Sequence, residues 1–291
     1  MPGSGGLLLV HAHPDDETIT CGGVMALAAG AGVPVTLVTC TRADLGEVIP
    51  PELAHLSGEA LAVHRDRELD AACALLGVTD RRYLGGAGTW SDSGMVATEG
   101  VVHAVAPASL APGAFAREED RDEQVAQLVA ILRETEPRVV VSYDRDGGYG
   151  HPDHVRAHEI TLAAVAEVDP DGEHLTVQAA VAPRDEVAAG LEALRRRQGW
   201  LPVPVPDVDA VPTVDDALVT TRVVLGPARA AKIDALRAHA TQITVLDDGH
   251  EPPAYTLSND LAQPVLAAES FVLLRGPKTP ADDLFPGEGP C

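Results

Sequence analysis

The chain carries, at residues 7–17, the stretch LLLVHAHPDDE, in which an apolar run is followed at once by two histidines and three acids. A short apolar run with polar flanks is typical of a buried strand. Acids just after a proline are typical of the start of a helix, where free backbone N–H groups favour negative charge. The stretch therefore predicts a strand that turns into a helix near Asp16, with imidazole and carboxylate groups at the turn.

The same combination returns at residues 139–154, which read VVVSYDRDGGYGHPDH. Here too an apolar run precedes histidines, an acid and a proline, and Pro152 suits the first turn of a helix. In open α/β sheets, ligand crevices form where the carboxyl ends of strands meet. We therefore expect the two polar clusters to converge on one metal site.

Composition limits the class of protein. With 291 residues, 45% of them hydrophobic, the chain can bury one sizeable core. Its formal charge of −23, from 44 acids against 21 bases, offers no basic face, so neither nucleic acid nor an anionic membrane is an expected partner. No apolar stretch approaches the roughly 20 residues of a membrane-spanning helix.

The cysteines and the N-terminal residues bear on the compartment. The four cysteines, at positions 21, 40, 73 and 291, show no CxxC spacing, and no signal peptide precedes Leu7. Disulfides and secretion are therefore not expected. We predict a reducing, cytoplasmic location.

Hydrophobic periodicity predicts alternating strands and helices up to residue 168. The expected strands cover residues 7–10, 34–40, 82–84 and 139–143, and the expected helices cover 16–29, 58–77, 122–134 and 154–168. Strands that alternate with helices in this way are typical of a parallel sheet with helices on its faces. The predicted fold class is α/β, with a mostly parallel sheet covered by helices.

The pattern is weaker after Val168. Prolines at 202, 204, 206 and 212 suggest edge strands and loops, and only a helix over 228–240 and a strand over 271–274 are clear. We predict a catalytic core at residues 1–165 that carries the metal site. A smaller, less regular subdomain at 166–275 is expected to complete the substrate pocket, and residues 276–291 are expected to form a loose tail.

His13, Asp16 and His154 form the predicted metal ligand set. Oxygen and nitrogen ligands without cysteine suit Zn²⁺ or Fe²⁺, and the sequence does not choose between the two. A catalytic zinc site needs three protein ligands and an open position for water. His13 and Asp16 lie three residues apart across the strand-to-helix turn, and His154 comes from the later helix.

Three neighbouring residues are not needed as ligands and are predicted to act in catalysis. Asp15 is the expected general base, which takes a proton from the attacking water. His151, expected to be held cationic by Asp15, Asp153 or another carboxylate, would stabilise the oxyanion and protonate a leaving amine. Tyr149, between Gly148 and Gly150, would close over the substrate and donate to the same oxyanion.

Each cluster taken alone also has a plain structural explanation. Asp-Asp-Glu after a strand is common as a helix N-terminal cap, and His-Pro-Asp-His as a surface turn. The occurrence of both clusters in one chain favours the metal site. His11 is expected to pack near it, His158 to be structural because no second zincin histidine accompanies it, and His239 to end a helix.

Other functional classes predict features that the sequence lacks. A nucleotide-binding Rossmann module predicts a glycine-rich G-x-G-x-x-G turn where the chain has two carboxylates. A serine hydrolase predicts a G-x-S-x-G elbow, and none occurs. A metal-dependent carbohydrate-binding protein that is not an enzyme would leave Asp15 without a role, so an Asp15→Ala variant would keep its function.

The paired motifs at 13–17 and 151–154 resemble the signature of the zinc-dependent N-acetylglucosamine de-N-acetylases related to the phosphatidylinositol-glycan enzyme. Five further segments resemble the mycothiol-pathway branch of this family. The first runs from Cys40 and Thr41 to Gly46–Val48, and the others are Leu84–Gly88, Trp90–Met95, Gly147–Gly150 and Ala238–Gln242. The resemblance spans most of residues 7–275 and is weakest between 170 and 225. Residues 18–21 and 42–45 depart from the family pattern.

The resemblance implies a Rossmann-like fold with one Zn²⁺ on His13, Asp16 and His154, a base at Asp15, and assistance from His151 and Tyr149. It also implies sugar and inositol contacts at three positions: Glu47, Arg65 and Asp92. The implied reaction is hydrolysis of the acetamide of N-acetylglucosaminyl-inositol, a small glycoside. Cleavage of a larger acyl group from a mycothiol S-conjugate is the alternative, and the oligomeric state stays open.

Overall fold

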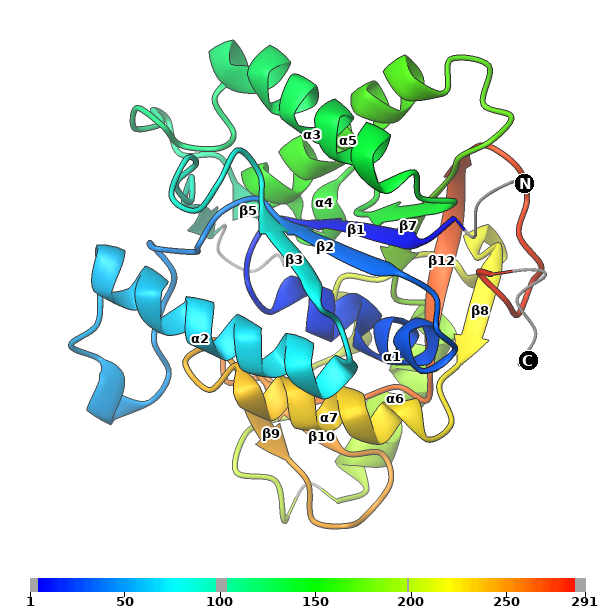
Figure 1. Ribbon diagram of the computed structural model, residues 1–291. Coiled ribbons are helices and arrows are strands. Elements are labelled where there is room, and N and C mark those ends of the chain that lie inside the picture. The colour runs from blue at the N-terminus through cyan, green and yellow to red at the C-terminus, as the bar shows by residue number, and fades with distance from the viewer. Residues whose placement is uncertain (1–4, 98–103, 198, 286–291) are drawn as a thin grey trace.

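The computed structural model describes residues 5–97, 104–197 and 199–285, and its centre is a seven-stranded sheet in the order β3-β2-β1-β6-β7-β12-β8 (Figure 1). Neighbouring strands from β3 to β7 run parallel, whereas β12 is antiparallel to both β7 and β8. The strand bounds are β1 Leu7–His11, β2 Val35–Thr39, β3 Asp80–Tyr83, β6 Val139–Ser142, β7 Thr176–Val181, β8 Thr221–Val224 and β12 Ala268–Arg275.

Helices cover both faces of this sheet (Figure 1). Side chains of β1 alternate between the two resulting cores, because successive residues of a strand point to opposite faces. Leu7 and Leu9 pack with α1, α2 and α7, whereas Leu8 and Val10 pack with α3 and α5. The helix bounds are α1 Asp16–Gly30, α2 Gly58–Leu76, α3 Arg121–Thr135, α4 Gly147–Gly150, α5 Pro152–Val168, α6 Arg184–Arg195 and α7 Ala228–Ala238.

Smaller elements lie between the main ones. A three-stranded antiparallel sheet is formed by β9 Thr244–Leu246, β10 Ala254–Thr256 and β11 Gln263–Pro264, and β4 Val96–Ala97 pairs with β5 Ala104–Val105. Short 3₁₀ turns cover Pro51–Leu53, Glu118–Asp120, Val208–Ala210 and Asp216–Leu218. Within the described ranges, every helix is too short or too polar to cross a bilayer.

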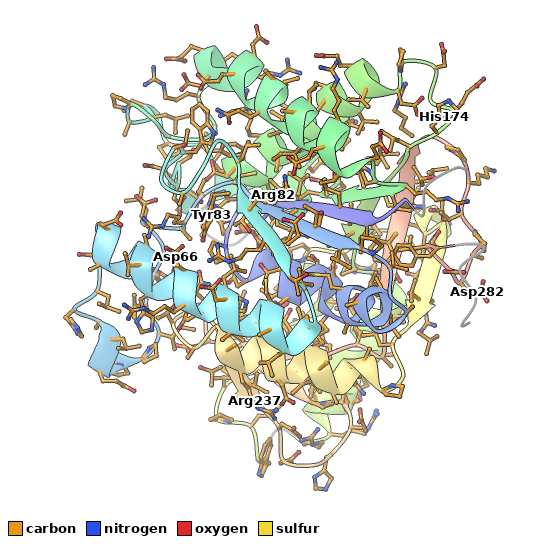
Figure 2. All side chains as sticks on the ribbon, in the orientation of Figure 1. Asp66, Arg82, Tyr83, His174, Arg237 and Asp282 are labelled. Atoms are coloured by element: carbon orange, nitrogen blue, oxygen red, sulfur yellow. The ribbon has the colours of Figure 1, made fainter. Side chains whose placement is uncertain are left out.

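Charged side chains protect the edge strand β3. Arg82 pairs with Asp80 on the same strand and with Glu134 of α3, and the Tyr83 hydroxyl donates to Asp66 of α2 at 2.7 Å (Figure 2). Charge on an edge strand discourages pairing with the strand of another chain. The open edge of the sheet is thus held to the helices on either side of it.

The chain order places the predicted site at a switch point of the sheet. After β1 the chain moves outward through β2 and β3, and it returns to the other side of β1 at β6. Such a reversal leaves a crevice at the carboxyl ends of the two central strands. Both polar clusters follow these ends and so lie at the same edge of the sheet, and the predicted α/β fold is confirmed.

The second half of the chain is more regular than its sequence suggested. β7, β8 and β12 continue the main sheet beyond residue 165, and β7 and α6 were not predicted. The division into a core and a C-terminal subdomain stays a prediction, although the main sheet crosses the proposed boundary.

The prediction of a loose tail is wrong for the described residues up to 285. Leu284 is buried in the core beneath α1, and the Ala281 carbonyl accepts from the Arg222 N–H at 2.7 Å. Thr279 also contacts Gln178 of β7 at 2.9 Å. An apolar residue near the chain end was enough to anchor the segment, while residues 286–291 lie outside the described residues.

A buried ion pair joins α1, α7 and β12. Lys232 donates to Glu269 and to the Ile19 carbonyl, both at 2.7 Å, and Glu269 accepts from the backbone N–H groups of Gly23 and Val24. Both side chains are under a tenth exposed. Removing one member of a buried pair leaves an uncompensated charge, which costs far more than losing a surface pair.

We therefore expect Lys232→Met to lower the free energy of unfolding by about 3–5 kcal/mol, measured by urea denaturation. The matched control is Arg133→Met, because Arg133 pairs with Glu167 on the surface, with both side chains more than half exposed. That control should cost about 1 kcal/mol or less. Equal losses in the two variants would contradict the importance of the buried pair.

Candidate metal centre and catalytic site

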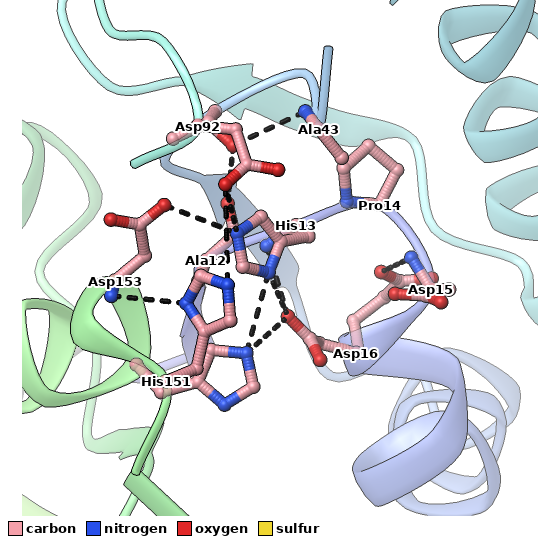
Figure 3. Close-up of polar contacts among 12 residues, drawn as sticks. Ala12, His13, Pro14, Asp15, Asp16, Ala43, Asp92, His151 and Asp153 are labelled. Carbon is pink, nitrogen blue, oxygen red and sulfur yellow. Dashed lines mark hydrogen bonds and ion pairs between the residues drawn. The ribbon is translucent and has the colours of Figure 1, made fainter. Parts of the chain in front are cut away.

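Three ligand atoms from the two motifs meet at one point, and Figure 3 shows the side chains of His13 and Asp16 facing each other there. The Nδ1 atom of His13 lies 3.2 Å from Oδ2 of Asp16 and 3.3 Å from Nε2 of His154. The distance between Oδ2 of Asp16 and Nε2 of His154 is also 3.3 Å. In a tetrahedral site with bonds of about 2.0–2.1 Å, neighbouring ligand atoms are separated by about 3.3–3.4 Å. The spacing therefore fits a tetrahedral cation with one open position.

Local structure explains how these side chains meet. His13 follows β1, Asp16 is the first residue of α1, and His154 lies in the first turn of α5, whose first residue is Pro152. The Asp16 carboxylate also accepts from the His13 N–H at 3.0 Å and from the Tyr143 hydroxyl at 2.7 Å. Asp16 is thereby held before any cation binds.

The outer nitrogens of both histidines face acceptors. His154 Nδ1 lies 3.1 Å from the Gly147 carbonyl, and His13 Nε2 lies 3.2 Å from Oδ2 of Asp153. An N–H on each outer nitrogen leaves the inner nitrogen with a lone pair for a metal, an arrangement typical of histidine ligands. Asp153 is fully buried and also accepts from the Ser93 N–H at 3.0 Å.

We expect Asp153→Asn to weaken metal affinity by about 10–100-fold, because a neutral amide oxygen is a weaker acceptor for the His13 Nε2–H than the charged Oδ2 of Asp153. A metal titration against a competing chelator measures this affinity. Asp169→Asn is the control, since Asp169 is also buried but accepts from backbone N–H groups away from the site, such as that of Leu175. Unchanged affinity in Asp153→Asn would contradict the assigned role.

Two other ligand groupings are present among the described residues. His13, His151 and His154 form one, and His13, Asp92 and Asp153 form the other, each with ligand atoms within 4.8 Å of one another. In the second grouping, Oδ1 of Asp92 lies 3.8 Å from His13 Nε2, farther than any separation in the set that includes Asp16. The structure thus brings the three predicted ligands together, and it places Asp153, which the sequence suggested as a partner of His151, beside His13.

The contacts of His151 favour a neutral ring over the cationic ring that the sequence suggested, and its catalytic role stays a prediction. Its Nδ1 accepts from the Asp153 N–H at 3.2 Å, which places the proton of a neutral ring on Nε2. Burial, together with the nearby His13 and His154, lowers the pKa of His151 to about 3. Asp153, one of the carboxylates expected to keep the ring charged, contacts it through its backbone N–H, and Oδ1 of Asp92 is 4.0 Å from Nε2.

Asp15 has an unusual backbone conformation, with φ 115° and ψ −35°. A non-glycine residue at such a φ costs about 1–3 kcal/mol and persists only where its surroundings impose it. Its side chain lines the cavity beside the ligand atoms. Burial and the adjacent Asp16 carboxylate raise the pKa of Asp15 to about 8.

Tyr149 lies beside the two histidines of the second motif, and its predicted role over the substrate stays a prediction. Its ring centroid is 5.1 Å from that of His154 and 6.1 Å from that of His151, both edge-on. The preceding Gly148 has φ 70° inside the short α4, a conformation that glycine adopts readily. Tyr149 lines the same cavity, in which burial raises the pKa of the phenol well above its ordinary value.

The cavity beside these residues has a volume of about 480 Å³. Glu47, Arg65 and Asp92 all line it, as the resemblance implied, and residues after 165, such as Val187, Tyr255 and Gln263, complete the wall. The volume lies within the range of about 300–1,000 Å³ found for small-molecule sites.

Arg65 has a structural function beyond the one expected. It is almost fully buried, and its guanidinium donates to the Ala43 carbonyl at 2.5 Å and to the Glu47 carbonyl at 2.8 Å. These bonds hold the loop that follows β2 against the cavity. Asp92 is also buried, with Oδ1 3.8 Å from His13 Nε2 and accepting from the Gly94 N–H.

The other histidines differ in role. His11 packs edge-on against Tyr143, and neither of its ring nitrogens has a partner among the described residues, which agrees with a packing role. His158 Nδ1 lies 2.9 Å from the Tyr143 carbonyl, as expected of a structural histidine. His239 does follow α7, but it is fully buried against Glu17. The only sequence signal for this buried contact was that His239 lies in Ala238–Gln242, one of the segments that resemble the family.

Comparison with known sequences matches residues 8–165 to the family described as PIG-L: GlcNAc-PI de-N-acetylase. A relative from Actinosynnema mirum is 48% identical over 287 residues, covering 97% of both chains. A relative from Saccharomonospora viridis is 46% identical over 285 residues, covering 97% of this chain and 100% of its own. Both are named 1D-myo-inositol 2-acetamido-2-deoxy-alpha-D-glucopyranoside deacetylase.

Among solved structures, the chain is similar to the N,N'-diacetylchitobiose deacetylase of Pyrococcus horikoshii. The TM-score is 0.52 at 21% identity, and the match covers 81% of this chain and 70% of the other. At this identity the likeness concerns the fold. It agrees with a mostly parallel sheet covered by helices.

Proposed function

Because the chain belongs to the GlcNAc-PI de-N-acetylase family, we propose that it hydrolyses the acetamide of N-acetylglucosaminyl-inositol to acetate and the free glucosaminyl amine. The observation that carries the proposal is the spacing of 3.2–3.3 Å among the ligand atoms of His13, Asp16 and His154, with Asp15 and a cavity beside them. Relatives of nearly full-length similarity that bear the name of this activity support the choice of substrate.

His13, Asp16 and His154 are the residues proposed to hold the metal, and we propose Zn²⁺, with Fe²⁺ as the alternative. When bound, such an ion supplies polarisation of a carbonyl oxygen and lowers the pKa of water toward about 7. The two histidines are already oriented for this by Asp153 and the Gly147 carbonyl.

Asp15 is proposed to accept the proton of the attacking water. A base works best when its pKa lies near the working pH, and the buried setting of Asp15 moves its pKa upward from the ordinary value. A cation beside it favours the ionised form, which is the form that accepts the proton. The same carboxyl group can then return that proton to the departing amine nitrogen.

His151 and Tyr149 are proposed to stabilise the negative oxygen that develops on the acetyl carbon. The neutral His151 carries its proton on Nε2, so it donates a hydrogen bond without becoming charged. The Tyr149 hydroxyl stays protonated because its pKa is raised, so it too is a donor. Neither role needs the cationic ring that the sequence suggested.

Glu47, Arg65 and Asp92 are proposed to contact the sugar and inositol hydroxyl groups. Their carboxylate and guanidinium groups form strong, charge-assisted hydrogen bonds with hydroxyl partners. A reducing, cytoplasmic location is also proposed, and it is supported by the free thiols of Cys21, Cys40 and Cys73, which are all buried.

The test is amine release from N-acetylglucosaminyl-inositol by the metal-reconstituted protein, with free N-acetylglucosamine run alongside. We expect turnover that prefers the inositol glycoside. Absence of turnover on either compound by protein that contains stoichiometric metal would contradict this substrate, and turnover of mycothiol S-conjugates alone would favour the amidase alternative.

A further inference from the structure

A cluster outside the metal ligands holds the peptide group between Pro14 and Asp15. The N–H of this group, on Asp15, donates to Oε2 of Glu17 at 3.0 Å. Its carbonyl, on Pro14, accepts from Nε2 of Gln242 at 2.5 Å. These two bonds fix the peptide group that precedes the residue with the positive φ, while the Asp15 carbonyl on the other side accepts from the N–H groups of Thr18 and Ile19 in α1.

Glu17 is itself fixed by a second contact across the fold. Its Oε1 atom lies 3.0 Å from Nε2 of His239 and accepts from the Thr18 hydroxyl at 2.6 Å. Glu17 and His239 are both fully buried. A buried carboxylate with several partners has little freedom to move. The position of the Asp15 N–H therefore depends, through Glu17, on His239, which is 222 positions from Glu17 in the sequence.

The segment that carries His239 and Gln242 is rigid. Between them, Thr241 donates through its N–H and its hydroxyl to Glu68 of α2, at 2.8 and 2.6 Å, and its carbonyl accepts from the Ile49 N–H. Thr241 is fully buried. The segment therefore transmits the position of α2 and α7 to the turn after β1.

A strained conformation persists only where its surroundings impose it. The bonds from Glu17 and Gln242 to the Pro14–Asp15 peptide group supply that restraint on one side of Asp15, and α1 supplies it on the other. We infer that Glu17, His239 and Gln242 are positioning residues that hold Asp15 at positive φ and so direct its carboxylate into the cavity. The inference rests on the proposed role of Asp15 in deacetylation. None of the three residues is needed as a metal ligand, so they act on the base and leave the ion in place.

Three variants test the inference. His239→Leu removes the donor to Glu17, and Gln242→Ala removes the donor to Pro14. His239→Gln is the conservative variant, because its amide nitrogen reaches about the place of the imidazole Nε2. Gln178→Ala is the matched control, since Gln178 is also buried but lies on β7 and donates to Thr279 in the segment after β12.

We expect His239→Leu and Gln242→Ala to lower kcat by about 10²-fold, because a small displacement of a catalytic group has effects of this size. KM and metal content should stay near those of the wild type, and His239→Gln should recover most of the loss. Crystal structures should show φ of Asp15 leaving the positive region in His239→Leu and Gln242→Ala, and retained in His239→Gln.

Wild-type kcat in both variants, with Asp15 still at positive φ, would overturn the inference, as would an equal loss in Gln178→Ala. If His239→Leu does not fold, Gln242→Ala decides, because Gln242 is only partly buried and its loss leaves no buried charge. If the wild type shows no turnover, the proposed function fails, and φ of Asp15 in the variant crystals then tests the positioning role separately.

Discussion

Asp15→Asn is expected to lower kcat for acetamide hydrolysis by about 10²–10⁴-fold, the range measured for removal of a general base. Asparagine has nearly the same shape as aspartate and tolerates positive φ better than most residues, so the strained turn can persist. The backbone N–H that donates to Glu17 is unchanged. What is lost is the ability to accept a proton from water.

Two measurements separate this outcome from simple damage to the site. Metal content should remain stoichiometric in Asp15→Asn, because Asp15 is not one of the three converging ligands. The buried control Asp169→Asn should retain wild-type kcat. An Asp15→Asn protein with unchanged kcat would exclude this residue as the base, and one without metal would show that Asp15 holds the ion.

The first half of the fold was predictable because its signals are local. Strand β1 needs only the run Leu7–Val10, and α5 needs only Pro152 and an apolar stripe, so both elements match their expected bounds within one or two residues. The convergence of the two motifs also followed from a general property of open sheets, in which strand ends meet at a switch point.

β7 was missed because its support is distant in the sequence. It contains Gln178, a polar residue that is unusual in a buried strand, and the Nε2 of this side chain donates to Thr279, 101 residues later. Nothing near Gln178 in the sequence signals that partner. α6 was missed although Val187, Leu191 and Leu194 share a buried face, because the prolines that follow made the whole region appear irregular.

The same limit applies to the site. The ligands could be named from short motifs, since each motif supplies residue types that metals prefer at a defined turn. The charge of His151 could not be predicted from its motif, because it depends on a backbone N–H at its Nδ1 and on two neighbouring imidazoles. The hydrogen bonds by which Arg65 holds the loop after β2 could not be predicted either, because they depend on two carbonyl groups whose direction is set by the loop conformation.

His154→Ala is expected to abolish metal binding at stoichiometric metal and to reduce turnover by at least about 10⁴-fold, because the lowering of the pKa of water from about 16 to about 7 is lost. Catalytic zinc sites keep three protein ligands, and only His13 and Asp16 would remain of the tight set. Removal of the metal from the wild type with a chelator should give the same loss of turnover. Added metal should restore turnover in the wild type but not in His154→Ala.

His158→Ala provides a closely matched control, since His158 lies one turn further along the same helix and is also buried. Its Nδ1 contacts the Tyr143 carbonyl and no ligand atom, so its loss should cost about 1–3 kcal/mol of stability and leave metal content intact. A His154→Ala protein that still binds one metal tightly would shift the assignment to His151, whose ligand atom lies within 4.8 Å of the His13 ligand atom. His151→Ala would then lose the metal, whereas under the present assignment it keeps the metal and loses the donor to the developing oxyanion.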